Sequence, residues 1–140
     1  MKFYSESSSQ TENLGKQIAS KLKGNEVIAF YGDLGAGKTT LTRGIADFFN
    51  LKNKVCSPTF AILNEYESSK VRLYHFDMYR IASLEDLEST GFFDYLGEGV
   101  FIIEWSENID KYLPKQTIKI KIEKNGENSR IITIEGADLN

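Results

Sequence analysis

The stretch GDLGAGKTT at residues 32–40 constrains the fold more than any other part of this sequence. It matches the pattern G-x-x-x-x-G-K-[ST], the signature of a loop that surrounds phosphate groups between a strand and a helix. Glycines allow successive backbone N–H groups to turn inward, Lys38 adds a positive charge, and Thr39 offers a hydroxyl to Mg²⁺. The motif predicts a nucleoside triphosphate site with Mg²⁺, built from Gly32, Asp33, Leu34, Gly35, Ala36, Gly37, Lys38, Thr39 and Thr40.

The flanking residues predict the strand and the helix that such a loop needs. Residues 27–31 (VIAFY) form a short apolar run, typical of a buried parallel strand, and lead directly into the loop. After the loop, Leu41, Ile45 and Phe48 recur at helical spacing. A chance match to the motif in a chain of this length is expected well under about once in a hundred. A glycine-rich turn that binds nothing is therefore the weaker interpretation.

Length and composition favour one domain spanning residues 1–140. The net charge of −3 argues against unaided binding to nucleic acid, which usually requires a basic surface, so any RNA would be held by a partner. No apolar run approaches the roughly 18–20 residues of a membrane span, and the N-terminus lacks the apolar stretch of a signal peptide. The single cysteine, Cys56, excludes an internal disulfide and fits a reducing compartment. We expect a cytoplasmic protein without membrane contact.

The remaining patterns predict an α/β fold, a single-domain P-loop NTPase with a three-layer sandwich, a mixed sheet and a C-terminal β-hairpin. Thr11 or a nearby serine would cap a helix that ends at Gly24, and the serine-rich residues 5–9 suit a loop. The continuous apolar run at 100–103 suits a central strand covered on both faces. The other expected elements are an antiparallel pair at 60–67 and 71–77, a helix at 83–91, and a hairpin at 118–122 and 130–134.

Two acids follow apolar strands and are candidates to complete the phosphate site. Glu104 follows residues 101–103, and Asp77 follows residues 73–76. Ligands of open α/β sheets gather at the carboxyl ends of the strands, where both acids would lie. One acid would bind Mg²⁺ and the other would hold the attacking water, and the strand before Glu104 is the cleaner of the two. A structural role stays open for each, and for Asp77 it is a cap on the turn into Met78.

Three further features deserve comparison with the site. Ser57, Pro58 and Thr59 lie about 20 residues beyond the P-loop lysine, where many P-loop enzymes place a loop that senses the γ-phosphate, although an ordinary turn explains the tripeptide as well. His75 is expected to be a packed structural residue within its strand. Trp105, next to the acid at 104, suits the core, a gate over the nucleotide, or a partner contact.

Taken together, GDLGAGKTT at 32–40, SPTF at 57–60, HFDMYR at 75–80 and EW at 104–105 closely resemble the bacterial TsaE (formerly YjeE) family, from about Thr11 to the C-terminal hairpin. The resemblance implies a small P-loop ATPase required for threonylcarbamoyladenosine next to the anticodon of tRNAs that read codons beginning with A. It also implies ATP as substrate, Mg²⁺ as cofactor, and the TsaD–TsaB heterodimer as partner. The tRNA would then be reached only through that complex.

By matching position, the resemblance assigns roles to individual residues. Lys38 and Thr39 would hold the phosphates and Mg²⁺, and Thr59 would occupy the switch position. Asp77 and Glu104 would be the functional acids, followed by the family's tryptophan at Trp105. The resemblance also places Thr11 near the nucleotide, although helix capping explains this residue equally well.

Other functional classes fit the sequence less well. A Ras-like GTPase should carry Asn-Lys-x-Asp after a late strand, but the Asn53–Lys54 pair comes early. A small-molecule kinase needs a lid and several arginines, whereas this chain has four arginines and no insertion of that size. A non-hydrolysing, nucleotide-gated adaptor stays open. Arg80, just past the acid at 77, is the candidate for an arginine finger, and slow hydrolysis by the isolated chain is expected.

Overall fold

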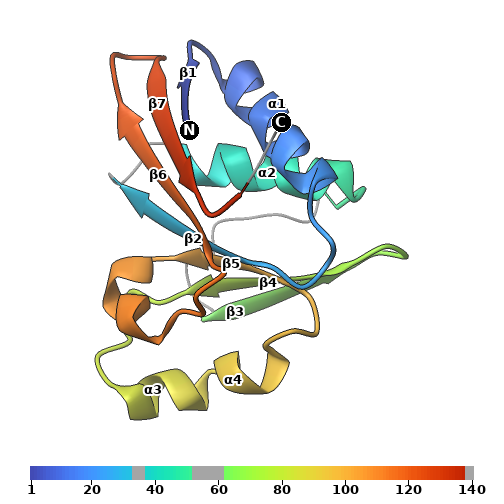
Figure 1. The fold of residues 1–140 in the computed structure, drawn as a ribbon, viewed down its shortest axis with the longest axis vertical. Helices are drawn as coiled ribbons and strands as arrows, with labels where there is room; N and C mark the ends of the chain where they lie inside the picture. Colours follow the sequence, from blue (N-terminus) through green and yellow to red (C-terminus); the bar gives the residue numbers. More distant parts are fainter. Residues whose placement is uncertain (33–36, 52–61, 138–140) are drawn as a thin grey trace.

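The computed structural model of the chain describes residues 1–32, 37–51 and 62–137. Figure 1 shows the path of the chain through these residues. In chain order, the elements are β1 (Lys2–Ser5), α1 (Ser8–Ser20), β2 (Val27–Gly32), α2 (Lys38–Phe48), β3 (Leu63–Glu67), β4 (Arg72–Asp77), α3 (Leu84–Ser89), α4 (Phe92–Tyr95), β5 (Val100–Glu104), the 3₁₀ helix η2 (Ser106–Tyr112), β6 (Ile118–Lys124) and β7 (Arg130–Glu135).

The described strands form one mixed seven-stranded sheet in the order β1-β7-β6-β2-β5-β4-β3. Its centre is parallel, because β2 pairs in parallel with β5 and with β6, and β4 pairs in parallel with β5. The outer pairs β1–β7, β6–β7 and β3–β4 are antiparallel. The predicted mixed sheet, central strand and C-terminal hairpin are confirmed.

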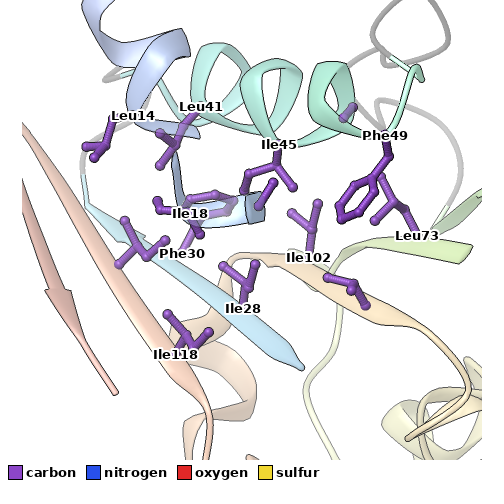
Figure 2. Close-up of a cluster of buried hydrophobic side chains, with 14 of the residues drawn as sticks. Leu14, Ile18, Ile28, Phe30, Leu41, Ile45, Phe49, Leu73, Ile102 and Ile118 are labelled. Atoms are coloured by element: carbon purple, nitrogen blue, oxygen red, sulfur yellow. The ribbon is translucent and has the colours of Figure 1, made fainter. Parts of the chain in front are cut away.

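Helices cover both faces of the sheet and make the predicted three-layer sandwich (Figure 1). α1 and α2 pack on one face, where Ile18 and Ile45 join a core with Phe30 and Ile102. Figure 2 shows these apolar side chains converging between α2 and the central strands. α3, α4 and η2 pack on the other face, where Leu87 joins a second core built largely from aromatic rings of β4 and β5. Because both faces of the central strands are covered, β5 is buried from Val100 to Ile103.

α1 and α2 approach each other closely because each carries a glycine at the crossing. A Cβ added to Gly44 would lie 2.0 Å from the carbonyl oxygen of Glu12, and a Cβ on Gly15 would lie 2.4 Å from that of Leu41. No side chain fits within such distances. The two glycines therefore fix how deeply α2 sits against α1, and so where the P-loop helix begins.

The structure differs from the sequence-based expectation at several local points. The serine-rich residues 5–9, expected as a loop, are divided between two elements: Ser5 ends the edge strand β1, to which β7 offers an antiparallel partner, and Ser8 and Ser9 begin α1. Of the two predicted caps of the first helix, the nearby serine is the one found: the side chain of Ser7 accepts a hydrogen bond from the backbone N–H of Gln10, and Thr11 lies inside α1, which ends at Ser20 rather than at Gly24. Two short helices, α4 and η2, were not predicted; they are too brief to show a helical repeat. Residues 60 and 61 of the predicted strand lie outside the described residues.

The longest described helices, α1 and α2, have 13 and 11 residues. None of the helices in the described ranges combines the length and the apolar character that crossing a bilayer demands.

Candidate nucleotide-binding site

The P-loop strand ends at a glycine that no other residue could replace without a shift of the backbone. Gly32 has a φ of +118°, and a Cβ added to it would lie 2.1 Å from the carbonyl oxygen of Ile122 on the neighbouring strand. The first glycine of the motif is thus required both by its backbone angle and by its close approach to β6. The next four motif residues, Asp33, Leu34, Gly35 and Ala36, lie outside the described residues.

The first turn of α2 has backbone N–H groups without partners inside the helix, at the end of the loop. Its N-cap is Gly37, with a φ of +109°, which supplies no side-chain cap. Lys38, Thr39 and Thr40 form the first turn and are half-buried. These N–H groups and the positive end of the helix macrodipole together suit an anion such as a phosphate.

Lys38 lies against an aromatic ring from a distant part of the chain. Its Nζ is 5.8 Å from the centroid of the Trp105 ring, within reach of a cation–π contact. Trp105 has a φ of +60°, one of two non-glycine residues with a positive φ in the described part of the chain. The indole is also packed edge-on against Tyr79, with 4.8 Å between the ring centroids. This left-handed turn directly after β5 places the indole beside the P-loop lysine.

The two predicted acids lie side by side at the carboxyl edge of the sheet. Asp77 and Glu104 are register partners at the ends of the parallel strands β4 and β5. Strand residues two apart share a face, and Leu73 and Ile102 point into the core beneath α2 (Figure 2). Both acids therefore lie on the sheet face that α2 covers, at the carboxyl strand ends where the sequence placed them.

The two acids have different local partners. Oε2 of Glu104 lies 2.7 Å from Nε2 of His75, and the Glu104 side chain is only 15% exposed. Oδ1 of Asp77 accepts a hydrogen bond of 3.0 Å from the backbone N–H of Tyr79, so this acid does cap the turn after β4. The capped turn leaves the second oxygen of Asp77 for another role, and its assignment as a functional acid stays a prediction.

The loop after β4 is tied to the loop after β5. The backbone N–H of Met78 donates to the carbonyl of Glu104 at 3.0 Å, and the side-chain amide of Asn108 donates to the carbonyls of Met78 and Tyr79 at 2.8 and 3.1 Å. The edge of the site is thereby held at a fixed spacing. Arg80, the predicted finger, is exposed beside this loop.

An arginine that the sequence analysis did not select lies next to the P-loop. Nε of Arg130 is 4.0 Å from the position of a Cβ on Gly37. Its Nη1 donates to the carbonyls of Gly126, Glu127 and Ser129 in the β6–β7 turn, which orients the guanidinium. Nothing local marks Arg130, because it belongs to no motif and lies more than 90 residues after the loop. Only the pairing of the strands brings it there.

A polar pair anchors η2 on the opposite face of the sheet. The hydroxyl of Tyr31, one residue before the P-loop, donates a short hydrogen bond to Oδ1 of Asp110, which also lies 3.3 Å from Nζ of Lys119. The hydrogen bond from Tyr31 lowers the pKa of Asp110, with a contribution from Lys119. Burial, followed by the bond to Asp110, raises the pKa of Tyr31. The pair fixes η2, and with it Asn108, against the start of the loop.

One further predicted residue has a partner of its own, and the others lie outside the described residues. Thr11 is 2% exposed, and its hydroxyl forms a 2.7 Å hydrogen bond with that of Ser5. Its assignment to the nucleotide stays a prediction. Ser57, Pro58 and Thr59 lie outside the described residues, as does Cys56.

The residues at the site fit a Mg²⁺ ion that arrives with a nucleotide. Within the described ranges, no three His, Cys, Asp or Glu side chains form a group that could hold a metal by themselves. Mg²⁺ usually keeps several waters and binds through one or two carboxylates together with substrate phosphates. Glu104, Asp77 and the hydroxyl of Thr39 are oxygen donors of the kind that Mg²⁺ prefers.

The fold and the motif define this chain as a P-loop NTPase by fold class. Its G-x-x-x-x-G-K-[ST] motif joins a strand to a helix at the carboxyl edge of a three-layer α/β sandwich. The model of the TsaE family, described as threonylcarbamoyl adenosine biosynthesis protein TsaE, matches residues 5–132. The chain belongs to the TsaE family, and the resemblance noted in the sequence is confirmed.

Individual relatives agree with the family model over most of the chain. The tRNA threonylcarbamoyladenosine biosynthesis protein TsaE of Aquifex aeolicus is 41% identical, covering 92% of this chain and 91% of the relative. The protein of that name from Bacillus subtilis is 38% identical, over 89% of this chain and 78% of the length of the relative. The crystal structure of Bacillus subtilis YdiB is similar to this chain, with a TM-score of 0.78 and 32% sequence identity. The match covers 96% of this chain and 83% of the YdiB chain.

Proposed function

We propose that this chain is a cytoplasmic, Mg²⁺-dependent ATPase that supports the threonylcarbamoyladenosine modification of tRNA next to the anticodon. It acts together with the TsaD–TsaB heterodimer, reaches tRNA only through that complex, and hydrolyses ATP slowly without it. Membership of the TsaE family supports the place in tRNA modification. The proposed ATPase activity depends on the site itself.

One observation carries the ATPase proposal. Lys38, at the first position of α2, lies over the ring of Trp105, the residue that follows Glu104 at the sheet edge where Glu104 and Asp77 end two parallel strands. Positive groups for phosphates and carboxylates for a metal or a water thus come to the same edge. Phosphoryl transfer depends mainly on such positioning and on electrostatic stabilisation.

Each described residue has a distinct role in this proposal. In hydrolysis, a water oxygen bonds to the γ-phosphorus while the bond from that phosphorus to the β–γ bridging oxygen breaks, releasing ADP and phosphate. Lys38 and the N–H groups of α2 stabilise the phosphate charge. Thr39 and Glu104 would hold Mg²⁺, which would supply charge neutralisation at the phosphates. Asp77 would bind the metal as well or orient the attacking water.

The proposed dependence on a partner follows from what surrounds the site. Arg80 is exposed at the rim, and the guanidinium of Arg130 donates to carbonyls of its own turn. An arginine finger supplied in trans can raise the rate by about 10³–10⁵. We therefore expect the docked partner to complete the site.

The primary test is Mg²⁺-dependent ATP hydrolysis by the purified chain, alone and with TsaD–TsaB, with GTP as the nucleotide control. We expect slow turnover alone and stimulation by the heterodimer that is specific for ATP. Lys38→Ala should abolish the stimulated activity while keeping the circular dichroism of the wild type. Lys70→Ala, an exposed lysine in the β3–β4 turn, serves as the matched control. No stimulation would favour a nucleotide-gated adaptor or a kinase, and an active Lys38→Ala variant would refute the phosphate site.

The metal assignment has a separate test. Glu104→Ala should reduce Mg²⁺-dependent turnover much more than it reduces nucleotide binding measured in EDTA. If both fall equally, Glu104 has a structural role and the metal must be held elsewhere.

A further inference from the structure

The chain's one histidine is buried beside the candidate metal acid. His75 lies on β4, two residues before Asp77, and its side chain is 0% exposed. Its Nε2 is 2.7 Å from Oε2 of Glu104 on the neighbouring strand. The sequence predicts a packed structural residue at this position, and the burial agrees, but the ring also makes a directed polar contact with the site.

The surroundings of the ring determine which nitrogen carries the proton. Nδ1 of His75 is buried and has no hydrogen-bond partner in the part of the chain that the structure describes. A proton on Nδ1 would be a buried donor without an acceptor, which costs free energy. A ring nitrogen without a proton and without a partner costs less. The carboxylate at 2.7 Å is an acceptor when ionised. The arrangement therefore favours a proton on Nε2, which donates to the carboxylate of Glu104.

This hydrogen bond occupies one oxygen of Glu104 and leaves the other for a ligand. Among the described residues, Oε1 of Glu104 accepts no hydrogen bond. A glutamate at a strand end has three side-chain torsions, so a carboxylate without a partner would sample several orientations. A buried ring on the adjacent strand removes that freedom. Hydrogen-bond donors behind a metal ligand usually serve this purpose.

We propose that His75 is a positioning residue, which aims the carboxylate of Glu104 at the Mg²⁺ of a bound Mg²⁺–nucleotide. The inference rests on the proposed function, since it concerns how the same site holds its metal. His75 does not touch nucleotide or metal. It acts through Glu104, and its loss should weaken the Mg²⁺-dependent part of nucleotide binding alone.

The test measures binding of a fluorescent N-methylanthraniloyl ATP at increasing MgCl₂ and in EDTA. For His75→Leu we expect the Mg²⁺ concentration that gives half of the Mg²⁺-dependent tightening to rise about 10–100-fold. Affinity in EDTA should stay within about twofold of the wild type. His75→Gln, whose amide can place a donor near the position of Nε2, should recover most of the loss.

Two controls separate positioning from a general weakening of the core. Leu73→Ala removes a fully buried side chain two residues earlier on the same face of β4, without touching Glu104. It should lower the free energy of unfolding and leave the Mg²⁺ requirement unchanged. In a Glu104→Gln background, adding His75→Leu should change the Mg²⁺ requirement by no more than about twofold. The proposal is wrong if Leu73→Ala raises the Mg²⁺ requirement as much as His75→Leu does. It is also wrong if His75→Leu raises that requirement in full in the Glu104→Gln background.

A second measurement does not depend on the folding of His75→Leu. Because the sequence holds one histidine, the imidazole ¹⁵N signals of the wild type belong to His75 alone. We expect a proton on Nε2, a change of that signal in Glu104→Gln, and a further change when MgCl₂ is added to protein saturated with a non-hydrolysable ATP analogue. A proton on Nδ1, or a signal that Glu104→Gln leaves unchanged, would overturn the proposal.

The outcomes also separate this inference from the proposed function. If the wild type binds the nucleotide but Mg²⁺ has no effect, the metal assignment fails and the positioning role fails with it. If Mg²⁺ tightens binding in the wild type and equally in His75→Leu, only the positioning role is overturned.

Discussion

The ammonium of Lys38 lies over the indole of Trp105, with 5.8 Å between Nζ and the ring centroid. The P-loop lysine and the residue after the candidate metal acid are thus in contact across the site. The strained left-handed turn at Trp105 makes this contact possible. Such strain at a site persists only where the surrounding structure holds it, and here the ring of Tyr79 packs against the indole.

Trp105 should help to position Lys38 for phosphate. Trp105→Ala removes a cation–π contact that is worth about 0.5–1 kcal/mol at an exposed site, so ATP affinity should fall about 2–5-fold. Trp105→Phe keeps a ring and should lose less. The affinities are measured by titration calorimetry. Equal affinities for the wild type and Trp105→Ala would show that the contact has no part in binding.

The same contact predicts a spectroscopic signal. Trp105 is the one tryptophan of the chain, so its emission reports on the site. Phosphates bound beside the ammonium of Lys38 should change the electrostatic surroundings of the indole, and so the fluorescence of the wild type. In Lys38→Met, saturating ATP should change the emission far less. An equal change in that variant would assign the signal to another group.

Arg130 should contribute to nucleotide binding because its guanidinium lies beside Gly37. Arg130→Ala should weaken ATP binding about tenfold, a loss of about 1.4 kcal/mol, and Arg130→Lys should recover part of it. Arg72, exposed at the start of β4 and paired with Glu67, provides the matched control. The affinities are compared at one salt concentration, since the interaction is electrostatic. A loss of the same size in Arg72→Ala would point to net charge rather than to position.

Gly44 should be required for the packing of α2 on α1. A Cβ at this position would lie 2.0 Å from the carbonyl oxygen of Glu12, so α2 must shift to accept it. We expect Gly44→Ala to lower the free energy of unfolding by about 1–3 kcal/mol, despite the better helix propensity of alanine. Urea unfolding measures this difference. Arg43→Ala, at the exposed neighbouring position of the same helix, should change stability by less than about 0.5 kcal/mol.

The Tyr31–Asp110 pair predicts how stability depends on pH. The pKa of Asp110 is lowered in the folded protein, so its contribution is present above the ordinary carboxyl pKa of about 4 and is lost as the pH falls below it. The pKa of Tyr31 is raised, so the contribution is also lost as the pH rises above about 10. Tyr31→Phe should therefore lower the free energy of unfolding by about 0.5–1 kcal/mol near pH 7, a small value because the pair is partly exposed to solvent. At pH 3 the same substitution should lower it by less.

Thermal and urea unfolding of the wild type and Tyr31→Phe across this pH range measure that difference. Tyr4→Phe, on a strongly exposed side chain, is the matched control and should show no pH-dependent difference. If the difference in free energy of unfolding between the wild type and Tyr31→Phe stays constant from pH 3 to pH 9, the contribution of the pair does not depend on the protonation of Asp110.

The sequence by itself determined the local features of this protein. The P-loop motif lies within nine residues, so its strand, loop and helix could be predicted from their order along the chain. The continuous apolar run of β5 indicated a strand buried on both faces. The alternation of apolar and polar residues in the C-terminal hairpin indicated strands buried on one face. Glu104 and Asp77 followed from the rule that sites form at the carboxyl ends of parallel strands.

Only the tertiary structure decided which groups meet around that loop. His75 and Glu104 are 29 residues apart, and Arg130 follows Gly37 by more than 90 residues, so no local pattern joins them. The contact of His75 depends on the register between β4 and β5, and that of Arg130 depends on the position of β7 in the sheet. The strand β1 likewise forms because β7 has a free edge beside it. Strand register and order are set by the packing of the whole core, which a single segment cannot encode.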